Sequence, residues 1–370
     1  METITVNQRE YCLPDRPLAV ICADGCAEEY LTLGFIHGEL PHLAKLAADG
    51  HCGLARGALP SFTNVNNCAM VTGTPPSQTG IGGNYILDPD TGEEVMTNSS
   101  RFLRNETILA AASAAGRKAA MVTAKDKLRE LLSKGMVVIA VSAEKADDVS
   151  LEVNGIADVE SRAGPKPSIY SGEASLYVLR VGVELLAAGR ADFLYLSLTD
   201  YMQHKFAPHM PESLDFYEGM DHEIGNMIEL GAIVGITADH GMNAKVKSDG
   251  SPNVIYLESL LNDKFGKGNK VICPITDPYV VHHGSLGSEV MVYLKDSSQT
   301  AEIVEWVHQL EGITEVYERA SAVTKLELPG DRIGDMIVMS ARDVVIGRTP
   351  EYHDLALVEV VLRSQGGRYE

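Results

Sequence analysis

Aspartates and histidines stand directly after two apolar segments of this chain. The segment 232–236 leads into Ala238-Asp239-His240-Gly241, and the segment 193–198 leads into Thr199-Asp200. His204 follows four residues after Asp200. A carboxylate oxygen and an imidazole nitrogen are both ligands suited to zinc. These two segments therefore predict metal ligands at the ends of two strands.

A third apolar segment, 18–23, ends in Asp24. Open α/β sheets place their chemistry at the carboxyl ends of the strands, so we expect Asp24, Asp200 and Asp239 to lie together. Three buried carboxylates repel one another unless cations neutralise them, and a pair of metals is the simplest solution. If a helix follows Asp200, residues 200 and 204 lie on one face as ligands of one metal. Taken singly, each aspartate also fits a helix cap and each histidine a structural role.

A nucleophile is predicted in the loop-like stretch 57–64, which carries the hydroxyls of Ser61 and Thr63. A hydroxyl is a weak nucleophile until a base or a metal activates it, and a nearby zinc would do so. We favour Thr63 and keep Ser61 as the competing candidate. The alternative for Thr63 is an ordinary helix cap.

Two lysines indicate an anionic ligand. Lys125 and Lys127 come directly after the predicted strand 119–123, where a helix begins. Cations oppose the helix dipole at an N-terminus, so their presence in an acidic protein points to a bound anion. The alternative is a solvated, basic helix start. Asn84, in Gly82-Gly83-Asn84-Tyr85, is a candidate donor to an oxyanion, and its alternative is a loop turn.

Composition restricts the class of protein. The 370 residues are 45% hydrophobic and 22% charged, which predicts a globular chain with a sizeable core. The net charge of −20 argues against nucleic acid as a partner, because phosphate backbones need Lys and Arg, but it allows a small anionic substrate. The six cysteines match no zinc-finger spacing. No signal peptide or membrane span is recognised, so a cytoplasmic protein is the expectation.

Strand-like and helical segments alternate in the first two thirds of the chain. This alternation, with continuously apolar strands, predicts an α/β fold with a mostly parallel sheet between layers of helices. The predicted strands are 18–23, 119–123, 136–141, 193–198 and 232–237, and the predicted helices are 41–47, 107–115, 126–132, 174–188 and 213–230.

The pattern changes after about residue 252. Further strands are predicted at 253–257, 290–294, 316–318 and 336–339, with a helical stretch at 300–310. We expect residues 1–250 plus 345–370 to form the catalytic core and 251–344 to form an inserted α+β cap. A lid is the natural use of such a cap. His282 and His283 lie in it and are interpreted as lid or supporting residues.

The chain resembles the alkaline phosphatase superfamily, and within it the phosphonoacetate hydrolase branch, over nearly its whole length. The two strings that carry Asp200 with His204 and Asp239 with His240 are specific to the superfamily, and the string with the paired lysines points to the branch. The supporting strings are VICADGC from residue 20, PSFTN from 60, TAKDKLR from 123, SAEKAD from 142, TDYMQHK from 199, TADHGMNAK from 237 and DPYVVHHG from 277.

The resemblance implies a zinc-dependent enzyme that hydrolyses the C–P bond of phosphonoacetate to acetate and phosphate. One Zn²⁺ would be held by Asp24, Asp239, His240 and the Thr63 oxygen. A second Zn²⁺ would be held by Asp200, His204 and a histidine near the C-terminus. Thr63 would attack phosphorus as a zinc-bound alkoxide and form a phospho-threonine intermediate. Substrate contacts would come from Asn84, Lys125, Lys127 and His204.

The sequence departs from the family pattern at the C-terminal ligand. Gln365, in Arg363-Ser364-Gln365-Gly366-Gly367, stands where the family has histidine. An amide oxygen is a poorer zinc donor than imidazole, which puts the second zinc in question. His353 is near in sequence, but nothing in the sequence assigns it to the site. The family also continues further beyond this string.

Two alternatives therefore stay open. One is a phosphodiesterase or phosphomonoesterase of the same superfamily. The other is an inactive phosphonate-binding or metal-binding member. In each case the partner is a small molecule, with a homodimer as an open option.

Overall fold

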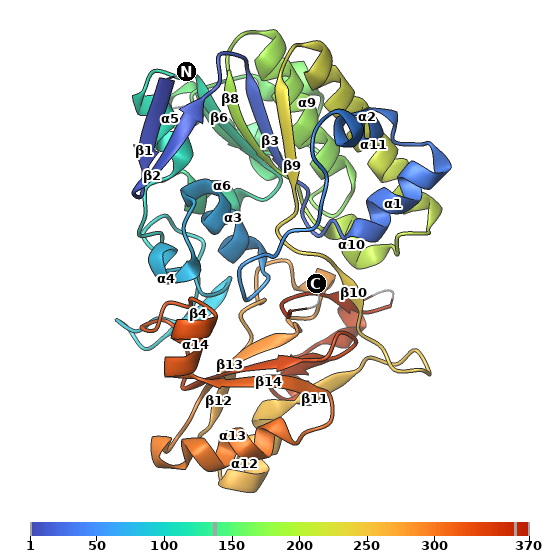
Figure 1. Ribbon diagram of the computed structural model, residues 1–370. Helices are drawn as coiled ribbons and strands as arrows, with labels where there is room; N and C mark the ends of the chain where they lie inside the picture. Colours follow the sequence, from blue (N-terminus) through green and yellow to red (C-terminus); the bar gives the residue numbers. More distant parts are fainter. Residues whose placement is uncertain (1, 136–138, 359–360, 369–370) are drawn as a thin grey trace. The chain divides into compact units, whose positions relative to one another are not determined.

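The computed structural model describes residues 2–135, 139–358 and 361–368 (Figure 1). Their contacts divide the chain into two compact units. Unit 1 comprises Met1–Arg56, Met70–Gly73 and Ser99–Asp239, and unit 2 comprises Gly57–Ala69, Thr74–Asn98 and His240–Glu370. These units follow from contacts between residues, whereas the predicted boundaries of the inserted cap come from the change in sequence pattern. The cap boundaries therefore stay a prediction.

Unit 1 contains a parallel five-stranded sheet in the order β7-β6-β8-β3-β9, counted over the described residues. The predicted parallel α/β fold is confirmed. Helices lie on both faces of this sheet in Figure 1. The strands are β3 (Leu18–Cys22), β6 (Ala119–Thr123), β7 (Ile139–Ser142), β8 (Phe193–Ser197) and β9 (Ile233–Thr237). Residues 136–138 of the predicted third strand lie outside the described residues.

The apolar strands of this sheet are buried because helices cover them. Alternate residues of β3, Ala19 and Ile21, point into one core with Leu194 and Leu196 of β8. The helices α9 (Glu173–Ala187) and α11 (Pro211–Glu229) supply the facing side chains of that core. The other helices of unit 1 are α1 (Glu28–His37), α2 (Pro41–Asp49), α5 (Ile108–Ala114), α6 (Asp126–Leu132), η1 (Ala143–Asp148), α7 (Leu151–Asn154), α8 (Val159–Ala163) and α10 (Tyr201–Lys205).

An N-terminal hairpin was not predicted from the sequence. Strands β1 (Glu2–Val6) and β2 (Arg9–Leu13) pair antiparallel around Asn7 and Gln8, whose φ angles are 48° and 67°. Two central residues with positive φ form the tight turn that suits the twist of a hairpin. Both strands are largely exposed, so they lack the apolar run that identifies the buried strands.

Unit 2 contains an antiparallel sheet in the order β12-β13-β15-β14 and several short strand pairs. The α+β pattern predicted after residue 252 is present. The strands are β4 (Tyr85–Leu87), β5 (Glu94–Met96), β10 (Asn243–Ala244), β11 (Val254–Tyr256), β12 (Lys270–Ile272), β13 (Glu289–Tyr293), β14 (Ile313–Glu318), β15 (Met336–Ser340), β16 (Val345–Gly347) and β17 (Arg363–Ser364). The helices are α4 (Pro76–Thr79), α12 (Leu257–Phe265), η2 (Val280–His282), η3 (Ser297–Gln299), α13 (Thr300–His308), α14 (Arg319–Lys325), η4 (Pro350–Tyr352) and η5 (Leu355–Leu357). Helix α3 (Thr63–Thr72) begins in unit 2, and the boundary between the units falls within it.

Within the described residues, every helix is too short or too polar to cross a membrane.

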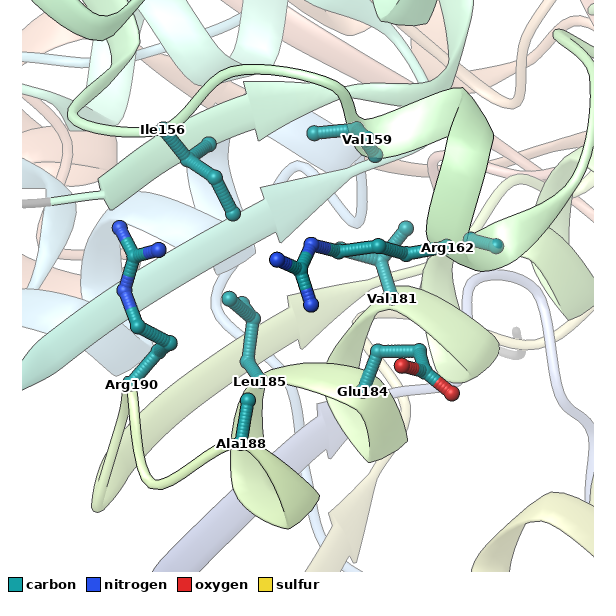
Figure 2. Close-up of a pocket in the computed structure, with 9 residues that line it drawn as sticks. Ile156, Val159, Arg162, Val181, Glu184, Leu185, Ala188 and Arg190 are labelled. Atoms are coloured by element: carbon teal, nitrogen blue, oxygen red, sulfur yellow. The ribbon is translucent and has the colours of Figure 1, made fainter.

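A surface groove of unit 1 is too small for a substrate. Figure 2 shows Arg162 and Arg190 beside the apolar side chains of Ile156, Val181 and Leu185. The groove has a volume of about 10 Å³, which is room for roughly one water molecule.

Candidate metal and substrate site

Three aspartates of unit 1 leave the sheet at its carboxyl edge. In the strand register, Cys22 of β3 pairs with Ser197 on one side and Thr237 on the other. Asp24, Asp200 and Asp239 follow these aligned residues by two or three positions. All three are buried, with exposed fractions of 1%, 2% and 1%. The parallel pairing therefore gathers three carboxylates at one edge.

Asp200 and His204 are joined as the spacing predicts. Helix α10 follows Asp200, and the His204 N–H donates to the Asp200 carbonyl oxygen at 2.9 Å. The His204 Nε2 lies 3.0 Å from Asp200 Oδ2. A carboxylate oxygen of Asp24 lies within 4.8 Å of one of Asp200. One turn of helix and the neighbouring strand thus bring three potential ligand atoms together.

Gly25 makes this close approach possible. Its φ of +70° lies in the left-handed region that favours glycine. A Cβ at this position would lie 3.1 Å from the Asp200 Cβ and 3.2 Å from the Gln203 Cβ. The Gly25 N–H donates to Asp239 Oδ1 at 3.3 Å. Gly25 is therefore packed against two of the three aspartates.

The donor set of unit 1 fits a divalent cation. Buried carboxylates and an imidazole are oxygen and nitrogen donors that suit zinc. Three buried negative charges also need positive charge close by. Part of it comes from Lys125, whose Nζ lies 3.0 Å from Asp200 Oδ1 in a pair that is 4% and 3% exposed. Lys125 thus supplies one of the positive charges that the three carboxylates require.

Both lysines of the anion-binding prediction are buried. Lys125 precedes the first residue of α6 and is 4% exposed, and Lys127 is 7% exposed. A solvated helix start would expose both ammonium groups, so that alternative does not describe these two side chains. Their strand, β6, is next to β8 in the sheet. This order explains how Lys125 reaches the aspartate that follows β8.

In unit 2, Thr63 is the first residue of α3 and is 4% exposed. Asn84 lies at the same helix start, because its Oδ1 accepts a hydrogen bond from the Asn64 N–H at 3.0 Å. This bond uses the amide oxygen of Asn84, and its amide nitrogen is the group that can donate to an oxyanion. The Ser61 hydroxyl donates to the Gly367 carbonyl oxygen at 2.9 Å. This bond engages the Ser61 hydroxyl within the fold, and the choice of Thr63 as nucleophile stays a prediction.

The histidines of unit 2 differ in what their rings do. His353 is held on both sides, since its Nε2 accepts from the Arg348 N–H and its Nδ1 lies against the Gly284 carbonyl oxygen, both at 2.9 Å. Burial lowers the pKa of His353, so its ring is neutral. With both ring nitrogens engaged in the protein, His353 is not available as a metal ligand. His283 accepts from the Ser285 N–H at 3.0 Å, and His282 is buried in η2.

Gln365 is 2% exposed and follows β17. Its backbone carbonyl oxygen accepts from the Ser288 N–H at 2.9 Å, which fixes the chain at this position. His240 follows Asp239 directly, and its Nδ1 lies 2.9 Å from the Gly241 carbonyl oxygen. Asp126, between the two buried lysines, was not singled out from the sequence. The alternation Lys-Asp-Lys was its only signal.

The fold and these residues can be compared with known proteins. The profile of the type I phosphodiesterase / nucleotide pyrophosphatase family matches residues 18–361. The chain belongs to this family. It is an enzyme of the alkaline phosphatase superfamily, and the predicted hydrolase class is confirmed.

Solved structures agree with this assignment. Phosphonoacetate hydrolase from Sinorhizobium meliloti 1021, crystallised with phosphonoformate and with phosphonoacetate, is 44% identical, with a TM-score of 0.95. The match covers 99% of this chain and 90% of that chain. Murine ectonucleotide pyrophosphatase / phosphodiesterase 5, in complex with AMP, is 15% identical, with a TM-score of 0.64 over 95% of this chain and 84% of that chain. The second likeness shows the fold alone.

Proposed function

We propose that this protein hydrolyses the C–P bond of phosphonoacetate and releases acetate and phosphate. The observation that carries the proposal is the pair of buried lysines beside the acidic edge of the sheet. A phosphoryl group alone is served by metals and a nucleophile, whereas a second anionic group on the substrate needs its own cations. The likeness to a hydrolase crystallised with phosphonoacetate supports the same substrate.

Two zinc ions are part of the proposal. Asp24, Asp239, His240 and the Thr63 oxygen would hold one, and Asp200, His204 and Gln365 the other. When bound, the metals would lower the pKa of the nucleophile and stabilise negative charge on the phosphonate oxygens. The oxygen and nitrogen donors of these residues fit that role, with the neutral amide of Gln365 as the weakest member.

The reaction is proposed to proceed in two steps. The Thr63 hydroxyl loses its proton to solvent, and Thr63 Oγ1 attacks phosphorus and forms a P–O bond while the C–P bond breaks. The bonding electron pair moves to carbon and is delocalised into the carboxylate as an enolate-like anion, which takes a proton from solvent to give acetate. Water then hydrolyses the phospho-threonine and returns Thr63 with release of phosphate.

Lys125 and Lys127 are assigned to the substrate carboxylate. Negative charge on that carboxylate grows as the C–P bond breaks, so cations placed there stabilise the transition state more than the bound substrate. Asn84 would donate its amide N–H to a phosphonate oxygen, and His204 would also contact the substrate.

Phosphate release from phosphonoacetate by the purified, zinc-supplemented protein tests the proposal directly. Thr63→Ala should abolish release, and Thr63→Ser should retain part of it because the hydroxyl is kept. Replacing Lys125 and Lys127 together by alanine should remove phosphonoacetate turnover but spare hydrolysis of a simple phosphate ester. A parent enzyme that cleaves esters but not phosphonoacetate would instead favour the phosphodiesterase or phosphomonoesterase alternative.

The second alternative is a binding protein without turnover, and Gln365 is the observation in its favour. Folded, zinc-loaded parent protein that releases no phosphate from any substrate would support it. Gain of activity in Gln365→His would then show that one ligand had silenced an otherwise complete site.

A further inference from the structure

The turn between β6 and α6 carries the two buried lysines on either side of Asp126. The Asp126 carboxylate accepts hydrogen bonds from Arg129 Nε at 2.6 Å and from Ser142 Oγ at 2.8 Å. Lys145 Nζ lies 3.1 Å from its other oxygen. The Asp126 side chain is 12% exposed. Three separate donors therefore hold one carboxylate in the middle of the lysine pair.

Glu144 holds the backbone of the same turn with both its side chain and its own N–H. Its Oε2 accepts from the Asp126 N–H at 2.7 Å, and its own N–H donates to the Ala124 carbonyl oxygen at 3.1 Å. The Thr123 hydroxyl donates to the Lys125 carbonyl oxygen at 2.9 Å. The backbone is thus fixed before and after Lys125. The side chain of Asp126 links this turn to β7 and η1.

The charges around the turn are directed to different partners. Arg129 and Lys145 face Asp126, whereas the Lys125 ammonium faces Asp200. Burial by itself would raise the pKa of Asp126, but hydrogen bonds from Arg129, Ser142 and Lys145, together with the charge of Arg129, hold this pKa at about 2. Asp126 is therefore ionised at every pH at which the enzyme would work.

We propose that Asp126 is a positioning residue that fixes the turn from which Lys125 and Lys127 bind the carboxylate of the substrate. It thereby sets the preference for phosphonates that carry a carboxylate. The inference rests on the proposed function, because it takes the two lysines as the carboxylate site. Small displacements of groups that hold a reacting substrate carry large penalties, up to about 100-fold for roughly 1 Å.

Asp126→Asn tests the inference, because it keeps the shape of the side chain and removes its charge. KM and the calorimetric Kd for phosphonoacetate should both rise about tenfold, the size of one lost charge-assisted hydrogen bond. The Kd for inorganic phosphate, which has no carboxylate, should stay within about twofold. Asp147→Asn is the matched control, since Asp147 pairs with Lys166 at 2.6 Å on an exposed part of η1. It should change neither value.

Lys145→Met is the second variant, for use if Asp126→Asn does not fold. Lys145 is 58% exposed, so its removal leaves no buried gap while Asp126 loses one of its three partners. It should raise the phosphonoacetate Kd about two- to threefold and leave the phosphate Kd unchanged. An equal loss for both ligands, or no loss for phosphonoacetate, would overturn the inference. A parent that binds phosphonoacetate but does not cleave it would contradict the proposed function only, because the ratio of the two Kd values still tests Asp126.

Discussion

Glu289 is a buried acid whose ionisation the fold opposes. It is the first residue of β13 and is fully buried, and among the described residues neither of its carboxylate oxygens has a hydrogen-bond partner. Glu289 pairs with Met339 of β15, which pairs in turn with Glu315 of β14, so both glutamates face the same side of the sheet. Burial, with the nearby charge of Glu315 as a second cause, raises the pKa of Glu289 well above its ordinary value of 4.5.

The raised pKa makes a specific prediction for Glu289→Gln. Between pH 4.5 and the folded-state pKa, the folded protein keeps a proton that the unfolded chain has lost. Wild-type stability must therefore fall as pH rises through this window, with a slope of up to about 1.4 kcal/mol per pH unit. Glutamine has no proton to lose, so the variant lacks this contribution. The difference in free energy of unfolding, variant minus wild type, should rise by up to about 2.7 kcal/mol from pH 5.5 to 7.5.

Urea denaturation at pH 5.5, 6.5 and 7.5 measures this difference. Glu315→Gln is the control on the same sheet, because the ion pair and hydrogen bonds from Arg368 are the main cause that lowers the pKa of Glu315. A lowered pKa contributes stability above pH 4.5 that is lost only as the solution becomes more acidic. Its effect should therefore be constant over the same range. A Glu289→Gln difference that stays within about 0.5 kcal/mol at all three pH values would refute the reasoning.

Three further predictions concern the proposed metal site. Gly25→Ala should weaken zinc binding at least tenfold, because the left-handed φ costs about 1–2 kcal/mol and the new Cβ displaces Asp200; calorimetry that gives wild-type affinity would contradict this. Lys125→Met leaves Asp200 buried without its ion pair, so the metal-free protein should lose about 3–5 kcal/mol of stability while zinc binds more tightly. Chelator competition and thermal unfolding test both effects, and weaker zinc binding would exclude a role for Lys125 as a competing cation. Gln365→His should raise the zinc content per chain measured by elemental analysis, and unchanged content would place the weak point elsewhere.

Much of unit 1 could be predicted from the sequence because its signals are local. Strands that are buried on both faces are continuously apolar, so β3, β8 and β9 were recognised within a residue of their ends. A helix after Asp200 was stated only as the condition under which Asp200 and His204 share a face, and α10 meets that condition. The grouping of Asp24, Asp200 and Asp239 was predicted because parallel sheets place functional side chains at the carboxyl ends of their strands.

The remaining features depend on contacts between distant residues. Whether Lys125 is solvated or buried is decided by β8, which is remote in sequence, and so the alternatives could not be separated beforehand. Nothing in the sequence assigned His353 to the site, and only its two ring contacts show what its ring does. Glu289 carried no sequence signal beyond its type, and Asp126 only its place between two lysines, because burial and hydrogen-bonding partners define their roles. The ligand roles themselves and the boundaries of the inserted cap stay predictions.

The order of strands in the parallel sheet has a consequence for synthesis on the ribosome. β3 is made early, yet both of its neighbours in the sheet, β8 and β9, begin only at Phe193 and Ile233. At about 5–20 residues per second, the apolar strand Leu18–Cys22 waits on the order of ten seconds or more for its first partner. During that time an unpaired apolar strand is exposed to other chains. Production of this protein should therefore depend on chaperones that bind unfolded chains more than its final stability suggests.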